Sequence, residues 1–165
     1  MKPLVVYYSH TGRTRAVAEM IAAAVSGELE QIAEIGVVRK GFMGFLRAGR
    51  GAMRKEKSEI EPPKKRPADY DLIVVGTPVW GWNLVPAVRR YLSTVDLAGK
   101  SVGFFCTMGT NGDARTFASM RELAPASRVL GELAVTQSES RDTEALKKKV
   151  ADWAREIQTK VSRPV

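Results

Sequence analysis

The chain is poor in the residues that build metal centres and disulfides. Among its 165 residues it has one cysteine, Cys106, and one histidine, His10. A lone cysteine excludes an internal disulfide and is typical of a reducing compartment, so we expect a cytoplasmic protein. We also expect no metal site, because one histidine and one cysteine are too few to assemble a cluster of nitrogen and sulfur ligands.

Long hydrophobic runs are also absent. No stretch approaches the 18 apolar residues of a membrane-spanning helix, so we expect no membrane span. The chain enters an apolar run within its first four residues, and we expect no signal peptide there. A hydrophobic content of 44% is ordinary for a globular protein, and the length predicts one domain over residues 1–165.

Several common phosphate-binding signatures are missing. There is no G-x-x-x-x-G-K-S/T and no G-x-G-x-x-G after the first apolar run, which excludes P-loop and dinucleotide-binding proteins. Six positions after Cys106 stands Gly112, where a small cysteine phosphatase would need arginine. A receiver domain would need acidic residues after the first strand and an aspartate at the end of the third, where Ser9 and Thr77 stand instead.

The positive charge is concentrated in one segment. Residues 38–67 hold ten cations and three anions, which is nearly all of the net charge of +8. Residues 36–69 are therefore predicted to be a basic insertion between the second and third strands. It is either a short helix with an apolar stripe of Phe42, Phe45, Leu46 and Met53 and a solvated cationic face, or a docking surface for an anionic partner or cofactor.

Buried-type apolar runs alternate with helical patterns along the whole chain. The runs predict five strands, at residues 4–8, 29–35, 71–76, 101–106 and 128–135. The first helix is expected over 13–25, with Gly27 as its stop, and the last is capped by Asp142 or Thr143. This repeat predicts an α/β fold, a five-stranded parallel sheet with helices on both faces.

Three polar loops that contain glycine follow the first, third and fourth strands, at residues 9–14, 77–83 and 107–113. In the strand order 2-1-3-4-5 these strands are neighbours, so the loops meet at the carboxyl edge of the sheet, where ligands bind. The first loop combines three hydroxyl residues with Gly12 in front of a helix, which favours a phosphate site made of neutral donors. The alternative is an ordinary turn with capping hydroxyls.

The three loops carry a family resemblance. Residues 5–18, V-V-Y-Y-S-H-T-G-R-T-R-A-V-A, resemble the phosphate loop of flavodoxins, and Ala22 then replaces a branched apolar residue. Residues 76–82, G-T-P-V-W-G-W, and 106–110, C-T-M-G-T, resemble the second and third flavin loops of flavodoxin-like flavoproteins. The resemblance covers nearly the whole chain and implies the three-layer flavodoxin-like sandwich with FMN as cofactor.

The resemblance also implies which residues bind FMN. The phosphate would be held by Ser9, His10, Thr11, Gly12, Arg13 and Thr14. The isoalloxazine ring would lie between two loops, which consist of Thr77, Pro78, Val79, Trp80, Gly81 and Trp82 and of Thr107, Met108, Gly109, Thr110 and Gly112. A flat ring favours an aromatic clamp, and Trp80 and Trp82 are the candidates, with anchoring of the core as the alternative. A peptide flip at Gly81 could form a hydrogen bond with the reduced flavin. Backbone amides near Gly109 and Thr110 could hold the pyrimidine edge of the ring.

Flavin carries the electrons in such proteins, so we expect no catalytic acid or base. The leading hypothesis is an FMN-binding electron-transfer flavoprotein that serves a redox partner protein or a small acceptor. The alternative is an NAD(P)H-dependent FMN or quinone reductase, in which cations of residues 39–66 engage the nucleotide's phosphates. A basic docking module for nucleic acid or membrane would leave the tryptophan loop unexplained, and we expect no nucleic-acid partner. The basic charge departs from the acidic character of familiar carrier flavodoxins.

Overall fold

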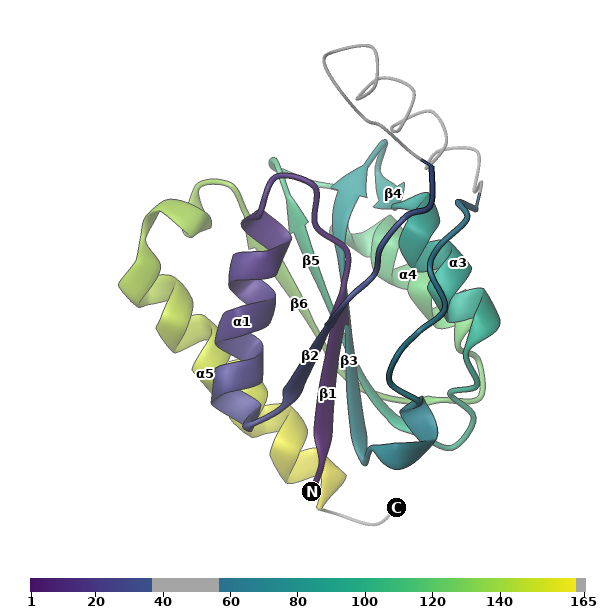
Figure 1. The fold of residues 1–165 in the computed structure, drawn as a ribbon. Helices are drawn as coiled ribbons and strands as arrows, with labels where there is room; N and C mark the ends of the chain where they lie inside the picture. The colour runs from purple at the N-terminus through teal and green to yellow at the C-terminus, as the bar shows by residue number, and fades with distance from the viewer. Residues whose placement is uncertain (37–56, 163–165) are drawn as a thin grey trace.

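The computed structural model describes residues 1–36 and 57–162 (Figure 1). The expected apolar stripe between Phe42 and Met53, with most cations of the basic insertion, lies outside these residues. The main elements are β1 (Pro3–Tyr7), α1 (Arg13–Val25), β2 (Glu28–Gln31), β3 (Leu72–Trp80), β4 (Asn83–Leu84), α3 (Pro86–Thr94), β5 (Ser101–Met108), α4 (Asp113–Leu123), β6 (Arg128–Thr136) and α5 (Thr143–Val161). Short 3-10 turns cover Pro67–Asp69 and Glu139–Arg141.

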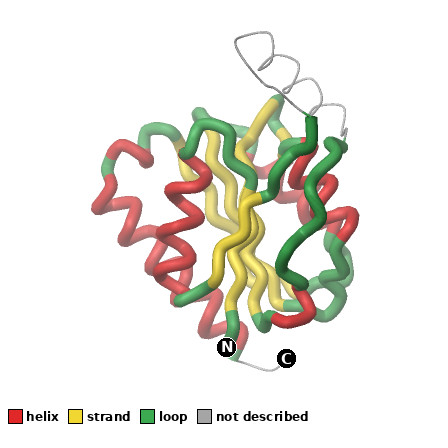
Figure 2. The backbone as a smooth tube through the Cα atoms, in the orientation of Figure 1, coloured by secondary structure: helices red, strands yellow, loops and turns green. Residues whose placement is uncertain are grey.

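The sheet confirms the predicted topology. Its strand order is β2-β1-β3-β5-β6 with parallel pairing throughout, which is the expected order 2-1-3-4-5. The difference is β4, a short strand that pairs with β3 antiparallel. In Figure 2 the strands form the central layer and the helices flank it on two sides.

Both faces of the sheet are covered, which explains the continuous apolar runs of its strands. Helices α1 and α5 pack on one face, where Val150 and Ile157 are buried against the strands, and α3 and α4 pack on the other, where Phe117 and Met120 are buried (Figure 1). Gly76 makes the closest approach in this core. A Cβ at this position would lie about 2.0 Å from the ring of Phe105, so any larger residue would force the buried ring to move.

The helix ends follow local capping rules, with one correction. Asp142 caps α5, as expected, and its Oδ1 accepts the N–H of Ala145 at 3.0 Å. At the end of α1 the left-handed residue is Ser26, with φ 55°, rather than Gly27. The N–H of Gly27 donates to the carbonyl of Ala22 at 2.8 Å, which closes the last turn.

Residues 57–66 form a strap along the outer side of β2. Strand β2 ends at Gln31, earlier than the predicted residue 35, because the following backbone pairs with the strap. Ile35 donates to the carbonyl of Glu59 at 2.9 Å, and Glu61 donates to that of Ala33 at 2.9 Å. The strap thereby covers backbone groups beside the sheet's edge strand, where an exposed edge would invite aggregation.

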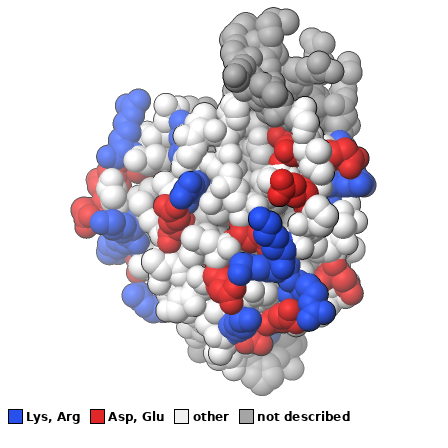
Figure 3. Space-filling view, in the orientation of Figure 1, with Lys and Arg blue, Asp and Glu red and all other residues white. Residues whose placement is uncertain are grey.

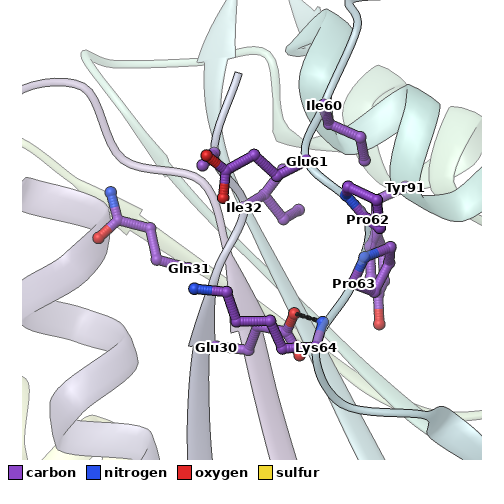
Figure 4. A pocket seen from close by; sticks show the side chains of 10 residues that line it. Glu30, Gln31, Ile32, Ile60, Glu61, Pro62, Pro63, Lys64 and Tyr91 are labelled. Carbon is purple, nitrogen blue, oxygen red and sulfur yellow. Dashed lines mark hydrogen bonds between the residues drawn. The ribbon is translucent and has the colours of Figure 1, made fainter. Parts of the chain in front are cut away.

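A small cavity lies between the strap, β2 and Tyr91 of α3 (Figure 4). Its volume is about 10 Å³, roughly the space of one water molecule. The hydroxyl of Tyr91 is buried and has no hydrogen-bond partner in residues 1–36 and 57–162, and burial raises the pKa of this hydroxyl. Figure 4 also shows the hydrogen bond from the N–H of Lys64 to Glu30, whose length is 2.6 Å. This cavity belongs to the packing of the strap and is far too small for a cofactor.

Charged side chains of both signs mix on the face that carries the strap (Figure 3). Lys65 forms an ion pair with Glu28, and Arg66 forms one with Asp69. Glu28 is the first residue of β2, so these cations lie near the amino end of the parallel strands. None of the helices in the described ranges is long and apolar enough to cross a membrane.

Candidate functional site

A cleft of about 270 Å³ opens where β1, β3 and β5 end. The three predicted loops meet there, together with the end of β6. Its lining residues are His10, Thr11, Arg13, Thr14, Pro78, Val79, Trp80, Thr107, Met108, Gly109 and Gln137. Ten of these eleven positions belong to the predicted site, and Gln137 is the addition.

The first loop is organised by Ser9 and Gly12. Gly12 has φ 95°, a conformation that suits glycine, and it precedes the first residue of α1. The Ser9 hydroxyl oxygen accepts the N–H of Gly12 at 3.1 Å and that of Arg15 at 3.3 Å. Ser9 therefore supports the loop from within, and neither Ser9 nor Gly12 lines the cleft.

Backbone N–H groups around the start of α1 remain available. Within residues 1–36 and 57–162, no acceptor is found for the N–H groups of Thr11, Arg13 and Thr14. They lie beside the positive end of the helix dipole, a geometry that suits an anion. Arg13 also lines the cleft, and no carboxylate of the described chain forms an ion pair with it, so the pocket is more positive than a set of neutral donors alone.

Two buried hydroxyls join the first and third loops. The Thr14 and Thr107 side-chain oxygens are 2.8 Å apart, and the two residues are 2% and 3% exposed. One hydroxyl donates to the other, which leaves one proton of the pair for another acceptor. Because both residues line the cleft, a ligand oxygen there could accept this second proton.

The second loop is a β-hairpin. Strand β3 continues through Thr77, Pro78 and Val79 to Trp80, and β4 returns after the two residues Gly81 and Trp82. These two have φ of 54° and 58°, the left-handed values of a type I′ turn. The sequence reading of residues 77–83 as a loop was wrong because it took Thr77-Pro78 as the end of the strand.

Thr77 lies beneath the cleft and does not line it. The residue is fully buried, its hydroxyl donates to the carbonyl of Pro78 at 2.8 Å, and its oxygen accepts the N–H of Val85 at 3.2 Å. Thr77 thus ties β3 to the start of α3 and fixes the base of the hairpin.

Trp80 forms one wall of the cleft. The residue is 7% exposed and packs with the core between α3, α4 and the sheet. Its ring packs nearly perpendicular to two other rings. The centroid of the Tyr8 ring lies 5.8 Å away with an interplanar angle of 89°, and that of the His10 ring lies 5.9 Å away with an angle of 87°. His10 is thus in contact with the aromatic wall as well as with the cleft.

Trp82 lies outside the cleft wall and is 55% exposed. Its indole Nε1 donates to Oδ1 of Asn111 at 3.1 Å, which fastens the hairpin tip to the third loop. Gly112, with φ 109°, makes room for this contact, because a Cβ there would lie 2.8 Å from Val79 and 3.2 Å from the Trp82 Cα. The two predicted clamp residues therefore occupy different places.

The third loop contributes Thr107, Met108 and Gly109 to the cleft, and Thr110 and Gly112 lie beyond its wall. Gln137 reaches the site from the end of β6, and its N–H donates to the carbonyl of Gly109 at 3.2 Å. Sequence reasoning missed Gln137 because the segment after the fifth strand has no glycine-rich or aromatic signal.

The remaining reactive groups take no part in the cleft. Cys106 is fully buried in β5, and burial raises the pKa of its thiol to about 12, so the thiol stays protonated at neutral pH. In the described part of the chain no group of three or more His, Cys, Asp or Glu side chains could hold a metal ion.

Fold and site together define a protein of the flavodoxin-like class. The family model described as Flavodoxin matches residues 2–157, and the chain belongs to this family. No curated protein sequence matches it significantly.

Solved structures share the fold. A protein of Bacteroides eggerthii described as a flavoprotein has 22% identity and a TM-score of 0.76, covering 95% of this chain and 98% of its own. A Lactobacillus acidophilus flavoprotein in complex with FMN has 23% identity and a TM-score of 0.69, covering 87% and 98%. Oxidised flavodoxin 2 of Bacillus cereus has 18% identity and a TM-score of 0.62, covering 97% and 99%.

Proposed function

We propose that this protein binds FMN in the cleft and transfers electrons through it as a flavodoxin-like flavoprotein. The observation that carries the proposal is that one cleft brings together a buried tryptophan wall and backbone N–H groups at a helix N-terminus that have no acceptor among the described residues. An anionic tail and a flat aromatic head are the two halves of FMN. The relative from Lactobacillus acidophilus was solved with this cofactor.

The phosphate would lie over the start of α1. The N–H groups of Thr11, Arg13 and Thr14 would donate to its oxygens, and the hydroxyl proton that the Thr14–Thr107 hydrogen bond leaves free would be a further donor. Ser9 and Gly12 would hold the loop in the shape that turns these donors inward. Arg13 adds a positive charge that favours a phosphorylated flavin over riboflavin.

The isoalloxazine ring would lie between the hairpin and the third loop. Trp80 would supply the aromatic contact, and backbone groups near Met108 and Gly109 would contact the polar edge of the ring. Bound FMN would supply reversible electron transfer, and the chain's residues would bind it, orient it and keep water from its inner face. The Gly81–Trp82 turn is the place where a peptide flip could respond to reduction.

Two cations of residues 39–66, Lys65 and Arg66, give no support to the NAD(P)H-dependent reductase. Lys65 and Arg66 are engaged in ion pairs with Glu28 and Asp69, near the amino end of the sheet. They are therefore poorly situated to hold the phosphates of a nicotinamide nucleotide at the opposite, carboxyl end, where the cleft lies. An electron carrier that serves a redox partner protein needs no such phosphate site, and this is the role that we propose.

Titration of the apoprotein with FMN and with riboflavin tests the binding proposal. We expect FMN to bind more tightly, with quenching of flavin fluorescence, and Arg13→Gln to weaken FMN binding with little effect on riboflavin. Arg155→Gln is the matched control, because it removes the same charge from an exposed position of α5 that does not line the cleft. Equal affinities for the two flavins would contradict a phosphate site in the first loop.

Steady-state assays separate the carrier from the reductase. We expect the flavin-loaded protein to be reduced by a flavodoxin reductase and to show no sustained NADPH oxidation with a quinone as acceptor. Turnover of NADPH with the quinone would overturn the carrier role while leaving FMN binding intact.

A further inference from the structure

Arg89 of α3 is a buried cation that forms no ion pair with any described residue. The residue is 4% exposed, and no carboxylate of residues 1–36 or 57–162 forms an ion pair with it. Its Nη2 donates to Oδ1 of Asn83 at 3.2 Å, and its Nε has no acceptor within the described part of the chain. Buried arginines are ordinarily paired with a carboxylate, because an uncompensated charge is expensive to remove from water.

The charge is bonded to a residue of the hairpin that supplies one wall of the cleft. Asn83, which accepts from Arg89, pairs with Trp80 across the β3–β4 ladder, and Trp80 lines the cleft. Asn83 is fully buried and its Nδ2 also finds no acceptor among the described residues, so the two side chains form a buried, donor-rich layer between the hairpin and α3. Burial lowers the pKa of the Arg89 guanidinium and outweighs the exposed carboxylate of Glu122, which raises it.

We propose that Arg89 sets the charge state and the reduction potential of FMN in the adjacent cleft. This inference rests on the proposed function. The oxidised ring is neutral, and uptake of two electrons and one proton gives it a charge of minus one, which a second proton would neutralise. A fixed positive charge behind a buried wall stabilises the anionic reduced ring, since charges interact strongly where water is excluded. Arg89 therefore raises the potential and keeps the reduced ring anionic.

The reduction potential of the FMN-loaded protein tests this role. It is measured by reductive titration with dithionite in the presence of a reference dye. We expect Arg89→Met to lower the midpoint potential at pH 7 relative to the unsubstituted protein. Arg90→Met is the matched control, because Arg90 is the next residue of the same helix, its side chain is 41% exposed and it pairs with Glu59 at 3.7 Å. Arg90→Met should leave the potential unchanged, and an equal shift in both variants, or none in Arg89→Met, would overturn the inference.

The pH dependence of the potential gives a second readout, which a purely structural role would not move. In the unsubstituted protein the slope should change at a lower pH than for free FMN in the same buffer, because the reduced ring resists its second proton. Arg89→Met, or Arg89→Gln if the first variant does not fold, should move this break to higher pH. A break at or above that of free FMN in the unsubstituted protein would overturn the inference without any variant.

Failure of the proposed function looks different. Protein that neither retains nor binds FMN would refute the flavin site itself. Protein that binds FMN with a potential insensitive to Arg89 would refute only the role of this residue.

Discussion

Trp80 and Trp82 are separated by one glycine and yet occupy opposite environments. Trp80 is buried between Tyr8 and His10, and Trp82 is 55% exposed and hydrogen-bonded to Asn111. In a continuing strand, residues two apart would face the same side of the sheet. The left-handed turn at Gly81 and Trp82 breaks this alternation and moves the second indole away from the cleft. Two residues of the same type in one motif therefore do not share a role unless the backbone between them is regular.

The largest effect is expected from Trp80→Ala. Loss of a buried tryptophan leaves a cavity, which typically costs about 3–5 kcal/mol of stability, and loss of ring contact weakens flavin binding by about 1–3 kcal/mol. Urea unfolding of the apoprotein and FMN titration measure the two effects. A folded Trp80→Ala protein with unchanged FMN affinity would contradict a contact between Trp80 and the flavin ring.

Gly112→Ala should act through the hairpin's contact with the third loop. The new Cβ would lie 2.8 Å from Val79 and the residue would keep φ near 109°, so both overlap and strain oppose the present structure. We expect a loss of about 2–3 kcal/mol in unfolding free energy.

Gly12→Ala is the matched control for this prediction. Gly12 has φ 95° and open space where its Cβ would lie, so strain acts there alone, at about 1–2 kcal/mol. Equal losses of unfolding free energy in the two variants would mean that overlap with the hairpin adds nothing to the cost of backbone strain.

Trp82→Ala should have a smaller effect than either. It removes an exposed hydrogen bond to Asn111, worth about 0.5–1.5 kcal/mol, and leaves the cleft wall intact. We expect FMN affinity to fall by less than about fivefold, which is about 1 kcal/mol. Fluorescence titration of Trp82→Ala and Trp80→Ala in parallel measures this difference. A loss of FMN affinity in Trp82→Ala as large as that in Trp80→Ala would show that Trp82 also contacts the flavin.

The smallest effect on the site is expected at the opposite end of the sheet. A hydrogen bond from Lys65, followed by one from Tyr70, lowers the pKa of Glu28 to about 2. Because this pKa is depressed in the folded protein, the stabilisation is present above the unfolded value near 4.3 and disappears as the pH falls toward about 2. Glu28→Gln should flatten the dependence of urea midpoints between these values and leave FMN affinity at pH 7 unchanged. Parallel curves for the two proteins would contradict this contribution of Glu28.

The parallel sheet and the meeting of three loops were predictable from sequence because strands buried on both faces read as unbroken apolar runs. The hairpin was not predictable, because Thr77-Pro78 resembles the end of a strand and a tryptophan is an unusual residue at positive φ. The positions of Gln137 and Arg89 were not predictable for a different reason. Each acquires its position from tertiary packing, and neither carries a local pattern.

A crystal structure of the FMN complex tests the central claim most directly. We expect the phosphate within hydrogen-bond distance of the N–H groups of Thr11 and Thr14, and the isoalloxazine ring against Trp80. A flavin bound with its phosphate away from the start of α1, or with its ring out of contact with Trp80, would contradict the account.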